Sequence, residues 1–303
     1  PPRSTLFPYT TLFRSLFTFA FNLQSVPVGI IGISYSVAAF PVLVKSFSIK
    51  DMDNYVNQIV LAARQIIFWS LPAIILLIVL RAQIVRVILG SDSFSWSDTR
   101  LTAASVALFA ISLFSQSLVL LFVRGYYAAG NTKKPLIINV FSSVMVIIFA
   151  QILVYIFKNY PAVLSSLEII LRVKDVPGTT MMALPLAYAM GSILNFFLIW
   201  FLFKKDLLTN HNINISRTFI ESFTSSISMG LTAYISLLLL DGIFDLTTGV
   251  GIFFQGFISG VLGIIVGIFV LSILKNKEYI DIAQALRSKF WRKRVVAPEQ
   301  GKL

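Results

Sequence analysis

The chain has 303 residues, of which 57% are hydrophobic and only 13% are charged, and its mean hydropathy is +0.84. Soluble domains carry about 25% charged residues, so the composition excludes an ordinary water-soluble domain. The absence of cysteine excludes disulfides, thiol catalysis and thiolate metal sites, and the single histidine, His211, excludes a metal site built on a histidine pair.

The first fifteen residues precede the first apolar stretch. Within them, Thr5 to Ser15 reads TLFPYTTLFRS and resembles the in-frame translation of a sequencing adaptor. Segments of that origin are set aside in fold reasoning. We therefore expect residues 1–15 to be an artefact and the remainder to be a fragment of a longer protein. An extended amphipathic lead-in is the alternative.

Seven apolar stretches follow, each long enough to cross a bilayer as a helix of about 20 residues. They cover residues 16–44, 58–80, 101–123, 136–157, 181–203, 219–240 and 249–274. The chain is therefore predicted to be an all-α integral membrane protein with about seven transmembrane helices. The longest loop, 158–180, is too short to fold as a domain of its own.

Proline and glycine interrupt the first stretch at Pro27, Gly29, Gly32 and Pro41, which predicts a bent or broken helix of the kind that lines cavities in transporters. Ionisable residues are nearly absent inside the stretches. Because intramembrane charges usually mark ion pathways, a proton relay or ion pump within these helices is not expected.

The last stretch carries Gly256, Gly260, Gly263 and Gly267 at spacings of four, three and four, which places them on one helical face. Small residues at this spacing favour close helix packing. A groove that accepts a lipid chain is the second interpretation of this face.

Basic residues alternate between rich and poor loops, and cytoplasmic loops are the rich ones. With the carboxyl terminus inside, the inner loops and tail hold 17 Lys and Arg residues. The outer loops hold six, namely Arg81, Arg86, Arg100, Lys158, Arg172 and Lys174. The sequence thus predicts a cytoplasmic carboxyl terminus.

The same distribution explains the net charge of +12 through anionic membrane lipids, without a nucleic-acid partner. The tail segment 275–294 reads as an amphipathic helix lying in the membrane interface, with Ile280, Ala283, Leu286 and Phe290 on one face. A partner-binding helix is the alternative for this segment.

Three stretches together resemble a known family. They are VPVGIIGISYSVAAFP at 26–41, RAQIVRVILGSDSFSWSDTR at 81–100 and RGYYAAGNTKKP at 124–135. In this order, and between these spans, they resemble the MurJ (MviN) lipid II flippases of the multidrug/oligosaccharidyl-lipid/polysaccharide exporter superfamily. The resemblance covers residues 16–294 and aligns the seven spans with helices 8–14 of the family's fourteen.

The resemblance implies a transporter of the bacterial cytoplasmic membrane that moves an undecaprenyl-pyrophosphate-linked peptidoglycan precursor to the outer leaflet by alternating access. No cofactor, metal or enzymatic step is implied. The chain would divide into a five-helix second-lobe bundle at 16–205, two further helices at 206–275 and a basic cytoplasmic tail at 276–303.

The resemblance also bears on site residues. The family's anion-binding arginines come mainly from the amino-terminal lobe, and one further arginine position matches Asn22 here. Asn22, Gln24 and Ser25 are therefore the candidates for the substrate cavity, while Asn22 as helix-interface glue is the competing interpretation. The expected structural markers of the family motifs are Pro27, Gly29, Pro41, Arg124, Gly125, Tyr127 and Pro135.

Three alternatives remain open on the sequence. The cargo could be another lipid-linked oligosaccharide, the chain could derive from a drug exporter of the same superfamily, or it could be a non-transporting scaffold that recruits cell-wall synthesis proteins through its basic tail. An enzyme is not expected, because the sequence shows no catalytic triad, metal-ligand cluster or phosphate-cradling glycine loop.

Overall fold

A computed structural model describes residues 8–90, 96–208 and 215–291, and these residues form helices joined by short turns, with no strand among them. The helices are α1 (Pro8–Pro27), the π-helix η2 (Val28–Ile33), α2 (Ser34–Ser48), α3 (Met52–Val79), α4 (Arg81–Leu89), α5 (Trp96–Ala110), α6 (Leu113–Ala128), α7 (Lys133–Asn159), α8 (Pro161–Leu171), the 3-10 helix η3 (Thr179–Met182), α9 (Ala183–Leu207), α10 (Ser216–Leu240), α11 (Gly249–Ile273) and α12 (Lys277–Trp291).

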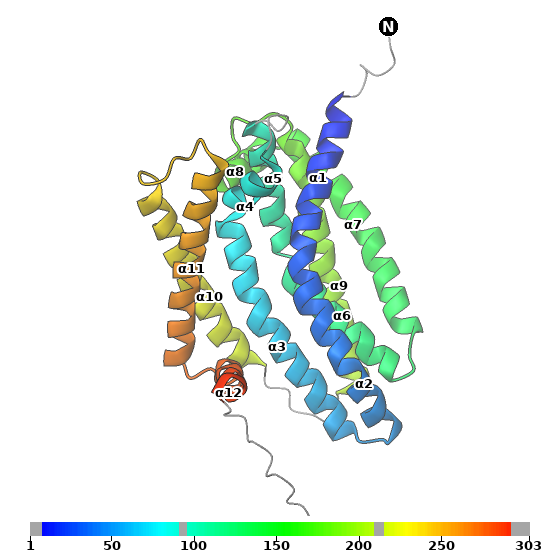
Figure 1. Ribbon diagram of the computed structural model, residues 1–303. Coiled ribbons are helices and arrows are strands. Elements are labelled where there is room, and N and C mark those ends of the chain that lie inside the picture. The colour runs from blue at the N-terminus through cyan, green and yellow to red at the C-terminus, as the bar shows by residue number, and fades with distance from the viewer. Residues whose placement is uncertain (1–7, 91–95, 209–214, 292–303) are drawn as a thin grey trace, which may run out of the picture.

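Within the described residues, six helical segments are long and apolar enough to cross a membrane, and a bent pair, α5 with α6, gives a seventh. The segments run side by side in one bundle (Figure 1). The predicted fold class is thus confirmed: the chain is an all-α membrane protein with six or seven spans.

The first span is continuous, and its helical irregularity lies at the predicted place, directly after Pro27. One helical segment runs from Arg14 to Ser48 through both Pro27 and Pro41, so proline does not break it. The π turn η2 follows Pro27 directly and takes up the irregularity that a proline introduces into the hydrogen-bond ladder. The helix also includes Pro8 to Ser15, part of the leader that we expected to lie outside the fold.

The third predicted span, 101–123, is the one that is broken. α5 and α6 meet at an angle of 42° around Ile111 and Ser112. Both the main-chain N–H and the hydroxyl of Ser112 donate to the Phe109 carbonyl, at 2.9 and 2.6 Å. A serine that bonds back to the preceding turn in this way competes with the α-helical ladder.

The core of the bundle lies among α3, α6 and α9. Aromatic rings fill it, with Phe122 centred 5.2 Å from both Trp200 and Phe203, and Tyr55 and Tyr126 fully buried beside them. α10 and α11 pack on each other and against α3 and α4, so the last two spans form a layer on one side of the bundle.

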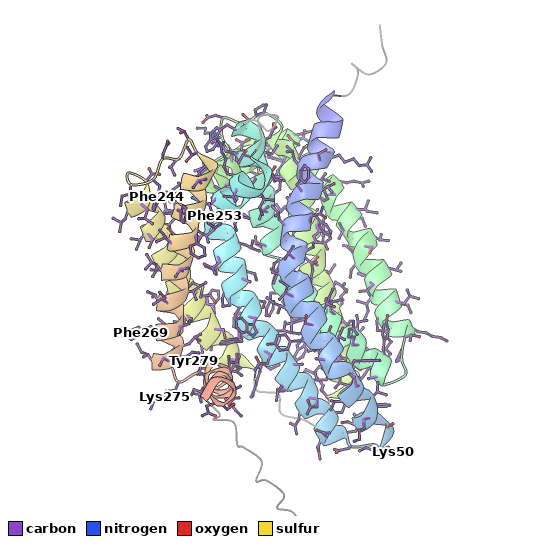
Figure 2. The ribbon with its side chains drawn as sticks, in the orientation of Figure 1. Lys50, Phe244, Phe253, Phe269, Lys275 and Tyr279 are labelled. Carbon is purple, nitrogen blue, oxygen red and sulfur yellow. The ribbon has the colours of Figure 1, made fainter. Side chains whose placement is uncertain are left out.

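The connections α2–α3 and α6–α7, the end of α9 and the start of α10 lie at the same end of the bundle as α12, and α4, α5 and α8 lie at the other end (Figure 1). Lys50 and Lys275 accordingly lie at one end and Phe244 at the other (Figure 2). Loops that the sequence predicts to be cytoplasmic therefore share one end. We call the end with α12 the basic end and the opposite one the distal end.

α12 is held to the basic end of α10 by polar contacts. Thr218 donates to the buried Glu278 at 2.9 Å, and Asn276 donates to Glu221 at 2.8 Å. Glu221 also pairs with Arg217 at 2.6 Å, so it belongs to this junction. Of the proposed apolar face of the tail, Ile280 and Ala283 are partly exposed. His211 and the arginines after Trp291 lie outside the described residues.

Candidate polar cavity within the bundle

A cavity of about 420 Å³ opens among η2, α6, α7 and α9. Its polar lining consists of Gln116, Asn139, Ser142, Ser143, Tyr188, Ser192 and Asn195. Gln116 lies 12 residues before the end of α6 at Ala128, which is about 18 Å along the helix axis. The cavity therefore lies at the depth of the hydrocarbon core, and we refer to it as the polar cavity.

Gln116 is the centre of a hydrogen-bond network at the wall of the polar cavity. Its amide nitrogen donates to Ser112 Oγ at 2.7 Å and to Gln24 Oε1 at 3.3 Å. Its amide oxygen accepts from the Tyr188 hydroxyl at 3.2 Å. One side chain thus links α1, α6 and α9, and it satisfies polar groups that lipid could not.

A second amide pair joins α7 to α9 at the polar cavity. Asn195 on α9 donates to Asn139 on α7 at 3.0 Å. Four buried atoms nearby have no partner within the described chain, namely Gln24 Nε2, Ser117 Oγ, Ser142 Oγ and Asn195 Oδ1. Because buried polar groups are normally paired, the two atoms that belong to cavity-lining residues, Ser142 Oγ and Asn195 Oδ1, indicate places for ordered water.

The three candidates predicted from the sequence fall in different environments. Gln24 is fully buried and belongs to the Gln116 network. Asn22 is exposed on the opposite side of α1, and Ser25 bonds to the Asn22 carbonyl of its own helix at 2.7 Å.

Sequence reasoning missed Gln116, Asn139, Tyr188 and Asn195. A signal for two of them was present: Asn139 with Ser142 and Ser192 with Asn195 recur at helical spacing inside apolar spans.

The motif at 124–135 lies at the basic end. Gly125 is buried: a Cβ there would lie 2.7 Å from the Phe203 ring. Its carbonyl accepts from Tyr55 at 2.8 Å. The hydroxyl of the buried Tyr126 donates to Asp206 at 2.9 Å, whereas Tyr127, the predicted marker, is exposed.

The rest of this motif forms the turn into α7. Lys134 pairs with Asp206 at 2.6 Å. Gly130, at φ 73°, ends α6 with the N–H of Asn131 bonded to the Tyr126 carbonyl, a Schellman arrangement. Pro135 is buried in the first turn of α7, and Arg124 is half-buried.

The motif at 26–41 contains the π turn. A Cβ on Gly32 would lie 2.8 Å from Ser117 Cα, so glycine allows close approach of η2 and α6. Gly29 has open space around it, and Pro27 and Pro41 are at least partly exposed within the continuous helix.

The four glycines of α11 are buried against neighbouring helices. A Cβ on Gly263 would lie 2.8 Å from the Met229 carbonyl, and one on Gly267 would lie 2.6 Å from Met229 Cε. Gly260 faces Leu80 and Gly256 faces Gln83, at 3.2 and 2.9 Å by the same measure. The glycine face is thus occupied by α10 and the α3–α4 junction.

No group of three His, Cys, Asp or Glu side chains that could hold a metal ion occurs within the ranges that the structure describes.

Comparison with known proteins places this bundle in a family. A family model described as "Lipid II flippase MurJ" matches residues 14–259. The chain belongs to the MurJ lipid II flippase family.

Curated MurJ relatives are moderately similar in sequence. A probable lipid II flippase MurJ of Vibrio cholerae is 24% identical over 73% of this chain and 44% of its own length. The Rickettsia prowazekii protein of the same description is 30% identical over 43% of this chain and 26% of its own length. The chain thus spans less than half of the length of these MurJ relatives.

A solved structure titled "Lipid II flippase MurJ, inward closed conformation" covers 89% of this chain and 48% of its own, with a TM-score of 0.61 and 21% sequence identity. At this identity, the likeness supports the MurJ fold.

Proposed function

We propose that this chain is part of a flippase that moves a lipid-linked peptidoglycan precursor across the bacterial cytoplasmic membrane by alternating access. The family match over residues 14–259 carries the proposal. A carrier of this kind needs a site with polar groups at membrane depth, and the polar cavity among η2, α6, α7 and α9 supplies one. The process requires no covalent chemistry.

The polar cavity is suited to the uncharged part of such a cargo. Amide and hydroxyl groups line it, and these hydrogen-bond to sugar hydroxyls and peptide groups. They carry no charge for a pyrophosphate, and Asn22 supplies none either. We therefore assign the pyrophosphate counter-charge to helices of the whole protein outside this chain.

The lipid tail of the cargo would not lie on the glycine face of α11, because α10 and the α3–α4 junction occupy it. The outer face of the same helix carries Phe254 and Phe269, which are 46% and 64% exposed. We propose this aromatic face as the surface that the polyprenyl chain contacts.

We also propose that the basic end faces the cytoplasm, in agreement with the excess of Lys and Arg in its loops. Because the chain contains no cysteine, single-cysteine labelling can test this directly. Cysteines at Lys133 and Ser288 should be protected from an impermeant reagent in intact cells, and one at Lys174 should react. Reaction of the first two from outside would reverse the assignment.

Complementation tests the transport function. The full gene that encodes this chain should restore growth to cells depleted of their lipid II flippase. Gln116→Leu should abolish rescue at normal protein level, because it removes the centre of the polar network. Gln151→Leu, the same change at an exposed position of α7, is the matched control and should rescue.

Each other outcome has a definite meaning. Failure of the unchanged gene, with protein present in the membrane, would favour a different lipid-linked cargo, a drug or a scaffold role. Full rescue by Gln116→Leu would show that the polar cavity is not used.

A further inference from the structure

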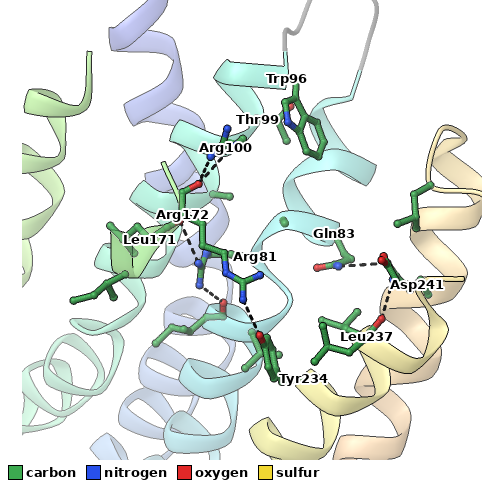
Figure 3. A pocket seen from close by; sticks show the side chains of 18 residues that line it. Arg81, Gln83, Trp96, Thr99, Arg100, Leu171, Arg172, Tyr234, Leu237 and Asp241 are labelled. Atoms are coloured by element: carbon green, nitrogen blue, oxygen red, sulfur yellow. Dashed lines mark hydrogen bonds between the residues drawn. The ribbon is translucent and has the colours of Figure 1, made fainter. Parts of the chain in front are cut away.

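A second cavity, of about 570 Å³, lies at the distal end of the bundle, outside the polar cavity. The end of α3, helices α4, α5, α10 and α11, and the turn after α8 form its walls. Figure 3 shows three arginines in this cavity: Arg81 from the start of α4, Arg100 from α5 and Arg172 from the turn after α8. We call it the arginine pocket.

The concentration of charge here runs against the distribution of basic residues in the sequence. The positive-inside rule predicts few Lys and Arg residues in the outer loops, and the outer loops of this chain hold six. Three of the six line this one pocket, although 91 positions separate Arg81 from Arg172. Asp241 is the single carboxylate among the lining residues, so the charged side chains of the lining carry a net positive charge.

The guanidiniums are held in place by neutral acceptors. Arg81 donates to the carbonyls of Ile78 at 2.9 Å and Leu171 at 3.4 Å. Arg172 donates to the Tyr234 hydroxyl at 2.7 Å and lies 5.8 Å from the centre of that ring. None of these contacts neutralises a positive charge.

The backbone at Arg172 fixes the third arginine. Arg172 ends α8 in the left-handed conformation, at φ 61°, and Val173 bonds back to the Glu168 carbonyl. This conformation exposes the Arg172 carbonyl, which accepts from both Nε and Nη2 of Arg100. The side chain of Arg100 is therefore bonded to the main chain of Arg172 within the pocket.

The surroundings of Arg81 disfavour its positive charge. Burial and, second, the positive charge of Arg172 lower the pKa of Arg81 below its ordinary value. A guanidinium has five N–H donors, so each of these three retains donors beyond the hydrogen bonds described above. Planar, multiple donors of this kind match the oxygens of a phosphate group.

The remaining walls indicate what the phosphate is attached to. Ile78, Leu171 and Leu237 give the pocket an apolar side, and Leu238 continues it to the outside of α10 with 58% of its surface exposed. Tyr234 lies six residues, about 9 Å, from the end of α10. The pocket is thus cationic at the membrane boundary and apolar toward the membrane interior.

We propose that the arginine pocket binds the phosphate group of an anionic glycerophospholipid, with Arg81, Arg100 and Arg172 around the phosphate and the acyl chains along α10. Under the topology proposed above, this lipid belongs to the outer leaflet. The site is separate from the polar cavity, so lipid binding here and cargo transport can fail independently.

Native mass spectrometry of the full-length protein in an uncharged detergent tests the proposal, with phosphatidylglycerol and the zwitterionic phosphatidylcholine as probes. Phosphatidylglycerol should bind more tightly. Arg81→Gln or Arg172→Asn should each weaken its binding by about tenfold, the loss expected for one charge-assisted contact. Asparagine tolerates the left-handed conformation at position 172, so that variant keeps the turn if Arg81→Gln fails to fold.

Lys174→Gln is the matched control. Lys174 is exposed, lies two residues after Arg172 and does not line the pocket, so its change should leave binding within about twofold. Unchanged affinity in Arg172→Asn, or an equal loss in Lys174→Gln, would overturn the site. Displacement of the lipid by millimolar inorganic phosphate would overturn the lipid assignment, because a free anion would then suffice.

Discussion

The polar cavity holds amides and hydroxyls around Gln116 and Asn195, whereas the arginine pocket holds three guanidiniums around Arg172. The difference follows depth in the membrane. A charged side chain at the centre of a transmembrane helix costs about 2.5–3.5 kcal/mol, and the cost falls toward the interface. Neutral hydrogen-bonding groups therefore line the interior cavity, whereas the three guanidiniums of the arginine pocket lie at the distal end of the bundle.

The largest test of this comparison places a charge in the interior. Gln24→Lys should destabilise the full-length protein by about 2.5–3.5 kcal/mol, because Gln24 is fully buried within the bundle. Ser48→Lys, at the exposed basic end of the same helical segment, should cost less than about 1 kcal/mol. Thermal unfolding in detergent measures both. Equal losses would show that depth and burial do not govern the charge pattern.

A packing change tests whether the arginine pocket depends on the close approach of α11. Gly256→Leu should cost about 1–3 kcal/mol, because even a Cβ at this position would lie 2.9 Å from Gln83 Cβ. The same change should weaken phospholipid binding by separating two walls of the pocket. Gly242→Ala, where a Cβ meets open space, is the control for stability. Normal stability and binding in Gly256→Leu would argue against close packing there.

The smallest expected effect sharpens the account of the arginine pocket. Tyr234→Phe keeps the ring beside Arg172 and removes only the hydroxyl that accepts its hydrogen bond, so it should cost about 0.5–1.5 kcal/mol. Tyr127→Phe, which changes an exposed phenol at the basic end, should leave unfolding unaltered. A loss in Tyr127→Phe equal to that in Tyr234→Phe would show that the bond to Arg172 contributes nothing specific.

The sequence predicted the number and order of the spans because a run of about 20 apolar residues has few alternatives to a membrane helix. It predicted less well which side of each helix is buried. In water, polar residues mark the outer face, but lipid is as apolar as the core, so hydrophobicity does not distinguish the two. Asn22 and Gln24 both looked like cavity residues, yet only Gln24 faces into the bundle.

Helix breaks were the other difficulty. Pro27 and Pro41 suggested a bent or broken first span, and the helix continues through both with a π turn directly after Pro27. The break of 42° that the sequence did not predict lies at Ser112, where a hydroxyl and a main-chain N–H share one carbonyl. Serine is common in membrane helices, and most helices that contain it still cross the membrane as one span. The presence of Ser112 therefore did not indicate this bend. Tyr127 was chosen as a family marker instead of Tyr126, because the sequence does not distinguish two adjacent tyrosines. Only the position of Asp206 shows that Tyr126 makes the hydrogen bond.

The π turn at Val28–Ile33 has a consequence for the face that α1 presents. A π turn accommodates one residue more than an α turn, and one residue corresponds to about 100° of rotation around the helix axis. Deleting Gly29, which has open space around it, would therefore rotate everything before it by about this angle relative to α2. Gln24 would then face lipid instead of the bundle. The direction in which this amide points is thus set by the additional residue of the π turn that follows.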